Sequence, residues 1–235
     1  MSEQEHVESL AHTYFTVQIP FDKKLVYFGY LTLKPYLKGP EGMELGSGDG
    51  DMTKYLIADF AQLTVVDGSA QLLAGIPDVP NLVKVHSLFE EFVPDRKFNT
   101  IIMGHILEHI EDTVLLLQRA KHWLAPDGRI LAIVPNGKSF HRLAAVKMGL
   151  LQDPCELNAR DLAVGHRRVY VPGTFKRDIE AAGLSLIEMG GIFFKPLSNQ
   201  QIQDQWTEEM IQGFYELGKD FPEQAAEIYV VCGNR

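Results

Sequence analysis

The sequence predicts an α/β fold built on a doubly wound, mostly parallel sheet of seven strands. Short apolar, β-branched runs alternate with helical patterns along most of the 235 residues. Several runs, such as TIIM and ILAIV, are apolar throughout, which is typical of strands covered on both faces. With 46% hydrophobic and 23% charged residues, the chain has the composition of an ordinary globular protein. The predicted strands are residues 42–45, 63–67, 82–86, 100–104, 129–134, 184–188 and 227–232.

Helical patterns fill the intervals between the strands, and two regions stand outside this alternation. Asp112 is placed to cap one helix, and Gly183 stands where another should stop. Residues 1–40 form an aromatic-rich, helical N-terminal cap, and residues 136–171 are too long for a plain turn and predict a lid-like insertion on the substrate side. Residues 1–235 are therefore predicted to form a single domain. The predicted helices are residues 51–61, 112–124 and 172–183.

Composition excludes several classes of partner. No apolar run approaches the roughly 20 residues that span a bilayer, and MSEQEHVESL lacks the features of a signal peptide, so we expect a cytoplasmic protein without a membrane partner. Cys155 and Cys232 give neither a disulfide framework nor a zinc pattern. The net charge of −9 argues against nucleic acid as a partner. Residues 138–177 nevertheless hold eight Lys/Arg against three acids, or +5, a local charge that suits a small anionic substrate.

A glycine loop follows the first predicted strand, in the run ELGSGDG. Glycines at this place let the backbone turn sharply and approach a ligand at a helix N-terminus. A nicotinamide or flavin enzyme would have G-x-G-x-x-G, but the position of the third glycine is Asp51. Asp67 ends the second strand, where an acid can accept both hydroxyls of a ribose. The loop glycines are Gly46, Gly48 and Gly50.

These motifs resemble those of class I S-adenosylmethionine-dependent methyltransferases. ELGSGDG is similar to the loop that holds the methionine end of the cofactor, VVDGS to the ribose motif, VHSLFEEF to the adenine segment, and FNTIIMGHILEHIED to the fourth-strand motif. The resemblance implies a Rossmann-like methyltransferase fold whose last strand is antiparallel, with S-adenosylmethionine as cofactor. Ser87 departs from the family, which often has Asp there. The implied cofactor-binding residues are Glu44, Gly46, Gly48, Gly50, Asp67, Gly68, Ser87, Leu88 and Gly104.

The stretch GHILEH has a second interpretation, because His105-x-x-Glu108-His109 matches the inverzincin zinc motif. That motif belongs on a helix, whereas this one straddles the end of the apolar strand TIIMG. We therefore expect the floor of a ligand pocket and no metal. Transfer of a methyl group to a hydroxyl requires a base, and histidine titrates near neutrality. The candidate catalytic residues are His105, His109 and His166.

The segment VGHRRVYVPGTF resembles ubiquinone-biosynthesis-type O-methyltransferases, where a Gly/Thr-His pair precedes an aromatic residue and a helix. We expect substrate contacts from Arg167, Arg168 and Tyr170, and Tyr14 of the N-terminal cap is expected to close over the site. The run IQDQWTEEMIQGFYEL has Trp206, Met210 and Phe214 at helical spacing, which predicts core packing or the face of a homodimer.

The leading hypothesis is methyl transfer from S-adenosylmethionine to a hydroxyl of a small metabolite, anionic or sugar-like. An alternative is methylation of an amine or a carboxylate on a small molecule or a peptide natural product. A third hypothesis is a non-catalytic protein that keeps the fold and the cofactor. The sequence does not name the acceptor.

Overall fold

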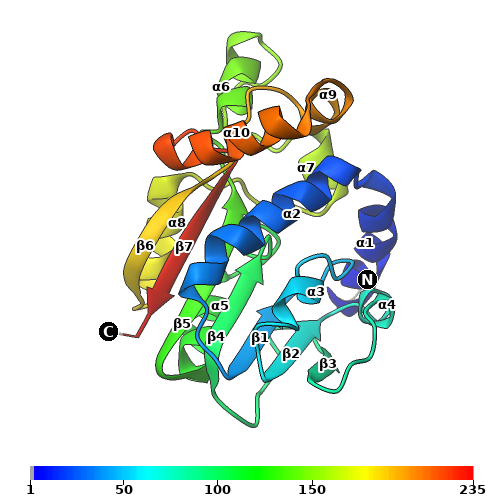
Figure 1. Cartoon of the computed structure of the whole chain (residues 1–235), viewed down its shortest axis with the longest axis vertical. Coiled ribbons are helices and arrows are strands. Elements are labelled where there is room, and N and C mark those ends of the chain that lie inside the picture. Colours follow the sequence, from blue (N-terminus) through cyan, green and yellow to red (C-terminus); the bar gives the residue numbers. More distant parts are fainter. Residues whose placement is uncertain (1–2, 235) are drawn as a thin grey trace.

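Seven strands form one mixed sheet in the order β3-β2-β1-β4-β5-β7-β6 (Figure 1). The computed structural model describes residues 3–234, except for the side chains of residues 12–17. Strands β1 to β5 pair in parallel, whereas β7 runs antiparallel to both of its neighbours, β5 and β6. The predicted seven-stranded α/β sheet is confirmed. The strands are β1 Glu41–Leu45, β2 Gln62–Asp67, β3 Leu82–His86, β4 Phe98–Gly104, β5 Leu124–Pro135, β6 Ser185–Ile192 and β7 Glu227–Gly233.

Helices cover both faces of this sheet. The helices are α1 Glu3–Val17, α2 Pro20–Leu33, the 3-10 helix η1 Lys34–Tyr36, α3 Thr53–Leu56, α4 Ala70–Gly75, α5 Thr113–Trp123, α6 Phe140–Lys147, α7 Ala159–Ala163, α8 Pro172–Ala181, α9 Asn199–Gln205 and α10 Glu208–Asp220. None of the helices in the described part of the chain is both long and apolar enough to cross a membrane.

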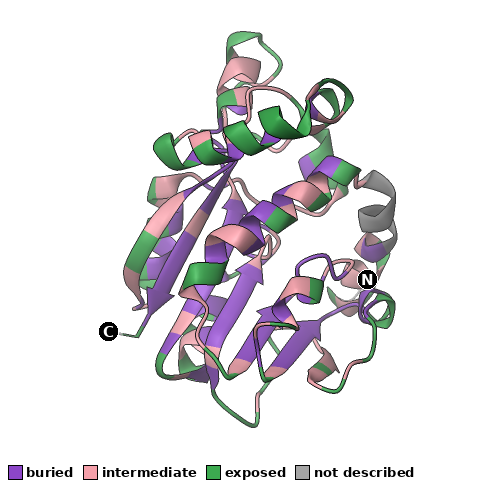
Figure 2. Cartoon of the chain, viewed as in Figure 1, coloured by how far each residue is buried: buried purple, intermediate pink, exposed green. Residues whose placement is uncertain are grey.

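Consecutive residues of the central strands point into two different hydrophobic cores. Ile101 belongs to the core beneath α5 and α8, whereas Ile102 belongs to the core beneath α2, α9 and α10. In β5, Ile130 likewise belongs to the first core and Leu131 to the second, because successive side chains of a strand point to opposite faces. The central strands are therefore buried between two helical layers, as Figure 2 shows, which explains their uninterrupted apolar sequence.

Helix α3 is shorter than the sequence predicted. The expected helix over residues 51–61 ends at Leu56 because the chain continues in tight turns. The carboxylate of Asp59 accepts hydrogen bonds from Tyr30 (2.7 Å) and Lys34 (3.0 Å), which tie these turns to the N-terminal region. The cap of α5 is confirmed, since the Asp112 carboxylate accepts a hydrogen bond from the Leu115 amide at 2.9 Å.

The aromatic run after residue 205 contributes to the core. Trp206 packs against Phe214 with ring centroids 4.4 Å apart, and both rings lie against the core beneath α10, whereas Met210 is exposed. The insertion, residues 136–171, includes α6 and α7 and returns to the sheet at Tyr170, which forms a bridge with Asn136. The parallel strands point toward this end of the molecule (Figure 1).

Candidate active site

A cavity of about 190 Å³ lies beyond the carboxyl ends of β1, β2 and β4. Strands β1 and β4 are neighbours in the sheet, and the chain continues from β1 to β2 on one side and from β4 to β5 on the other. In α/β sheets, ligands bind at the point where the strand order reverses in this way. Most of the cofactor-binding residues that the sequence implied line this cavity. They are Glu44, Gly46, Gly48, Asp67, Gly68, Leu88 and Gly104.

The loop after β1 requires glycine at its first position. Gly46 has a φ of 76°, a conformation that favours glycine. A Cβ atom there would lie 2.0 Å from Cδ1 of Ile106, so any side chain would displace the wall of the cavity. Gly48 and Gly50 also have positive φ, but Gly50 faces Ile76 and lies outside the cavity lining.

Two acids lie beside this loop, Glu44 one residue before the end of β1 and Asp67 at the end of β2. Asp67 Oδ2 accepts hydrogen bonds from the backbone amide and hydroxyl of Ser47 (2.7 and 2.9 Å), and Oδ1 accepts one from the Ser69 amide (2.8 Å). Burial raises the pKa of Asp67, while these hydrogen bonds lower it in part. Glu44 is almost fully buried and accepts a hydrogen bond from Thr53 (2.6 Å); burial raises its pKa to about 8.

The loop after β3 supplies apolar cover to the cavity. Leu88 and Phe89 line it. Ser87 lies outside the lining, where its hydroxyl donates to the Leu88 carbonyl at 2.9 Å. The segment that the resemblance placed at the adenine therefore offers side chains that can cover a flat ring.

Helix α1 covers the cavity from the other side. Val7, Leu10 and Ala11 line it, and the Glu8 carboxylate accepts hydrogen bonds from the Ser69 hydroxyl and from the Ala70 amide (3.0 Å). Tyr14, which was predicted to close over the site, has a side chain that lies outside the described part of the structure. Sequence analysis missed the apolar residues of α1, although their spacing over one helical face was a usable signal.

His105 follows β4 directly and lies between two carboxylates. Its backbone is left-handed, with a φ of 56°. Its Nδ1 atom is 3.4 Å from Glu108 Oε1, and its Nε2 atom is 3.4 Å from Glu227 Oε1. Burial lowers the pKa of His105, but the charges of Glu227 and Glu108 outweigh it and raise the pKa well above its ordinary value.

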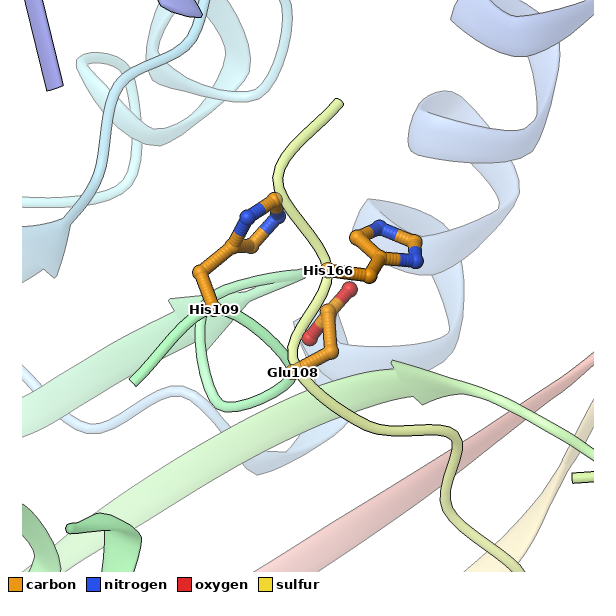
Figure 3. Close-up of side chains that lie close together, drawn as sticks. All are labelled: Glu108, His109 and His166. Carbon is orange, nitrogen blue, oxygen red and sulfur yellow. The ribbon is translucent and has the colours of Figure 1, made fainter. Parts of the chain in front are cut away.

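Glu108 also has two histidine neighbours, and Figure 3 shows the side chains of Glu108, His109 and His166 close together. The rings of His109 and His166 meet edge to face with centroids 4.8 Å apart. His166 Nδ1 is 3.1 Å from Asp161 Oδ1, and burial lowers the pKa of His109 to about 4. His109 lines the cavity, whereas His166 stands behind it.

Among the residues that the structure describes, Glu108, His109 and His166 also form a group whose atoms are close enough to be considered as metal ligands. Their potential ligand atoms lie up to 4.8 Å apart, whereas two ligands of one tetrahedral cation are about 3.3 Å apart. In this arrangement the three side chains are polar neighbours and do not form a closed metal site.

The structure corrects two of the predicted substrate residues. Tyr170 is only 2% exposed and its hydroxyl donates to Asp178 at 3.1 Å, so it packs in the core near α5 and α8. Arg168 donates to the carbonyls of Ile110 and Glu111 and thereby holds the turn before α5. Neither residue lines the cavity, because the return of the insertion to the sheet turns both side chains toward that helix layer.

Arg167 is the arginine that lines the cavity. Its guanidinium lies 2.7 Å from Glu3 Oε1 of α1 and 3.4 Å from Glu111 Oε2. It therefore joins the insertion to the N-terminal helix at the rim of the cavity.

The methyltransferase domain family matches residues 26–189, and the chain belongs to this family. The ubiquinone biosynthesis O-methyltransferase of Xylella fastidiosa (strain M23) is 22% identical over 192 residues, covering 74% of this chain and 73% of the relative. The same enzyme of Aeromonas salmonicida (strain A449) is 24% identical over 174 residues, covering 70% and 71%.

Solved structures with the same fold include methyltransferases in complex with the cofactor or its product. The complex titled DhpI-SAM-HEP has a TM-score of 0.63 at 16% identity, covering 97% of this chain and 94% of that one. The N-methyltransferase NodS from Bradyrhizobium japonicum WM9, with S-adenosyl-L-homocysteine, has a TM-score of 0.61 at 14% identity, covering 97% of both chains. The protein is a methyltransferase that depends on S-adenosylmethionine.

Proposed function

We propose that the protein transfers a methyl group to a hydroxyl of a small acceptor, anionic or sugar-like. The observation that carries this proposal is a neutral imidazole, His109, in the wall of the cavity close to the end of β4. A hydroxyl acceptor needs such a base to remove its proton, whereas a carboxylate acceptor does not. The O-methyltransferase names of the relatives support the same reaction.

The cavity fits the cofactor of the family. The absence of a Cβ at Gly46 leaves backbone exposed for the methionine end, and Asp67 presents an acid to the ribose. Gly68 and Leu88 stand where the adenine would be covered, and Glu44 and Gly104 complete the floor. When bound, S-adenosylmethionine supplies an activated methyl group on a sulfonium. The chain then has to orient the acceptor in line with that methyl group and exclude water. Helix α1 and the insertion, which both line the cavity, would do this.

His109 is arranged to act as the base. Its ring interacts with the backbone of Gly165, and burial keeps the imidazole neutral, so that it can accept a proton. His166 stands behind it, and the Asp161 carboxylate orients its ring through Nδ1. Arg167 at the rim then contacts an anionic group of the acceptor. To do so, this group has to displace the Glu3 carboxylate from the guanidinium.

The acceptor is identified by incubating the protein with cell extract and isotope-labelled S-adenosylmethionine and following the label by mass spectrometry. His109→Ala and His166→Ala are then compared with His122→Ala, an exposed histidine on α5. We expect His109→Ala to lower turnover by about 10²-fold or more, with the affinity for the cofactor product nearly unchanged. Normal turnover of the true acceptor by both variants would contradict a hydroxyl acceptor and favour methylation of a carboxylate.

A further inference from the structure

His105 is held between carboxylates that come from distant parts of the chain. Glu108 lies three residues further on, in the turn after β4, whereas Glu227 is the first residue of β7. The two carboxylates face the two different ring nitrogens, each at 3.4 Å. The side chain of His105 is 29% exposed and lines the cavity, whereas those of Glu108 and Glu227 are 1% and 7% exposed. The imidazole therefore faces the cavity, and the carboxylates lie behind it.

With both carboxylates ionised, only the doubly protonated ring offers an N–H to each of them. A neutral imidazole has one N–H and one lone pair. The lone pair of its second nitrogen would therefore face a lone pair of a carboxylate oxygen, which is repulsive. Both oxygens of Glu108 and Oε2 of Glu227 are buried without a hydrogen-bond partner in the described part of the chain. A buried carboxylate needs a counter-charge, and Glu108 and Glu227 share the single positive charge of the His105 imidazolium.

The other titratable groups around the pair do not take over this role. His109 and His166 lie close to Glu108, and His109 is neutral because burial lowers its pKa to about 4. Lys195, which follows β6, also interacts with Glu227, and burial lowers its pKa to about 8. Its ammonium group donates a hydrogen bond to Asn199 at 2.7 Å. Within the described part of the chain, His105 is thus the cation that contacts both carboxylates.

The backbone fixes the ring in this place. A φ of 56° is uncommon for histidine, and such conformations persist where the surrounding structure holds them. The His105 amide donates to the Ile133 carbonyl of β5 at 2.9 Å, which anchors the residue to the sheet.

We propose that Glu227, together with Glu108, is a positioning residue that keeps His105 as an imidazolium facing the acceptor. This inference rests on the proposed function and deepens it, because it assigns separate roles to the histidines. His109 receives the proton of the acceptor hydroxyl, and the positive charge of His105 stabilises the negative charge that develops on the acceptor oxygen. His105 is then not the base, and the site favours acceptors with an acidic hydroxyl over acceptors that bind as ammonium ions.

The protonation state of His105 is measured by NMR on protein labelled with ¹⁵N in its histidine rings, with His105→Gln to assign the signals. We expect both ring nitrogens of His105 to remain protonated at pH 8. In Glu227→Gln the ring should lose a proton at a pH at least about one unit lower. Glu223→Gln, the same change at an exposed position four residues earlier, should leave the titration as it is.

Kinetics give a second readout, which a merely structural role would not move. In Glu227→Gln, kcat should fall about tenfold at pH 8 and recover toward acidic pH as His105 regains its proton, while the KM for the cofactor stays nearly constant. Glu227→Asp, which restores the charge, should recover part of the loss.

Two results would overturn the inference. One is a wild-type His105 that carries a single ring proton at pH 8, which needs no variant and so does not depend on how well Glu227→Gln folds. The other is a folded Glu227→Gln protein whose His105 titrates as in the wild type. Neither measurement requires methyl transfer, so failure of the proposed hydroxyl chemistry is recognised separately in the acceptor screen.

Discussion

Asp67 ends β2 and Glu44 lies one residue before the end of the neighbouring strand β1, yet their surroundings favour different charge states. Asp67 receives three hydrogen bonds, two from backbone amides, and these stabilise its carboxylate against the effect of burial. Glu44 receives one hydrogen bond and has a pKa of about 8, so it is mostly protonated at neutral pH. Asp67 is thus the acid that is suited to accept hydrogen bonds from a ribose. A cation close to Glu44 would lower the pKa of Glu44 and so favour its charged form.

Replacing Asp67 with Asn should weaken binding of S-adenosylhomocysteine by about tenfold or more, since a hydrogen bond to a charged group contributes roughly 1.5–3 kcal/mol. Isothermal titration calorimetry measures this, with Asp78→Asn, at an exposed position, as the control. Equal dissociation constants for wild type and Asp67→Asn would remove Asp67 from the cofactor site.

At the scale of elements, α1 and α4 are joined directly over the cavity. The Glu8 carboxylate of α1 accepts hydrogen bonds from Ser69, the N-cap residue of α4, and from Ala70. Leu10 packs closely against the insertion, since a Cβ on Gly165 would lie 2.5 Å from Leu10 Cδ1. A ligand in the cavity is thus covered by a helix whose attachment depends on a few contacts.

We expect Glu8→Gln to speed the release of S-adenosylhomocysteine by about fivefold or more, because charge-assisted hydrogen bonds are roughly twice as strong as neutral ones. Stopped-flow fluorescence measures the dissociation rate. The control is Glu91→Gln, at an exposed position after β3. An unchanged rate would show that α1 does not limit exit from the cavity.

The strands and the glycine loop could be predicted because their signals are local. Residues 82–86 were predicted as a strand and form β3 without change, and Gly46 is required by the backbone itself. The pairing of His105 with Glu227 could not be predicted, since the resemblance implied an antiparallel last strand but not the register of β7 beside β5 that places Glu227 there. Tyr170 was assigned to the substrate because nothing in the sequence distinguishes a hydroxyl that reaches Asp178 in the core from one that reaches a ligand. Local patterns therefore predict elements, and contacts between elements require the fold.

At the scale of the whole molecule, partly buried histidines with lowered pKa values make stability depend on pH. Burial lowers the pKa of His109 to about 4 and that of His141 to about 2, whereas a histidine in the unfolded chain titrates near 6.5. Below pH 6.5 the unfolded state therefore binds protons that the folded state does not, and the folded state loses stability as the pH falls. His105 has the opposite sign, because its raised pKa contributes stability that is lost only as the pH rises through the folded-state value.

The free energy of unfolding should fall between pH 6.5 and about 4 by roughly 1.4 kcal/mol per pH unit for each buried neutral histidine. Urea denaturation at a series of pH values measures this slope. His141→Gln should make the slope shallower, whereas His122→Gln, at an exposed position, should not. A slope that His141→Gln leaves unchanged would mean that His141 is already protonated in the folded protein.

The place of β7 in the sheet has a consequence for the order in which a nascent chain becomes active. Strands β1 to β4 and the cavity residues they carry leave the ribosome early, and protein domains begin to fold during synthesis. Glu227 emerges more than a hundred residues after His105, and β7 then has to insert between β5 and β6. A growing chain that ends before β7 can therefore form the first four strands while the imidazole still lacks one of its two carboxylates. Completion of the charge arrangement at His105 thus coincides with closure of the sheet, so a chain that has not finished folding lacks it.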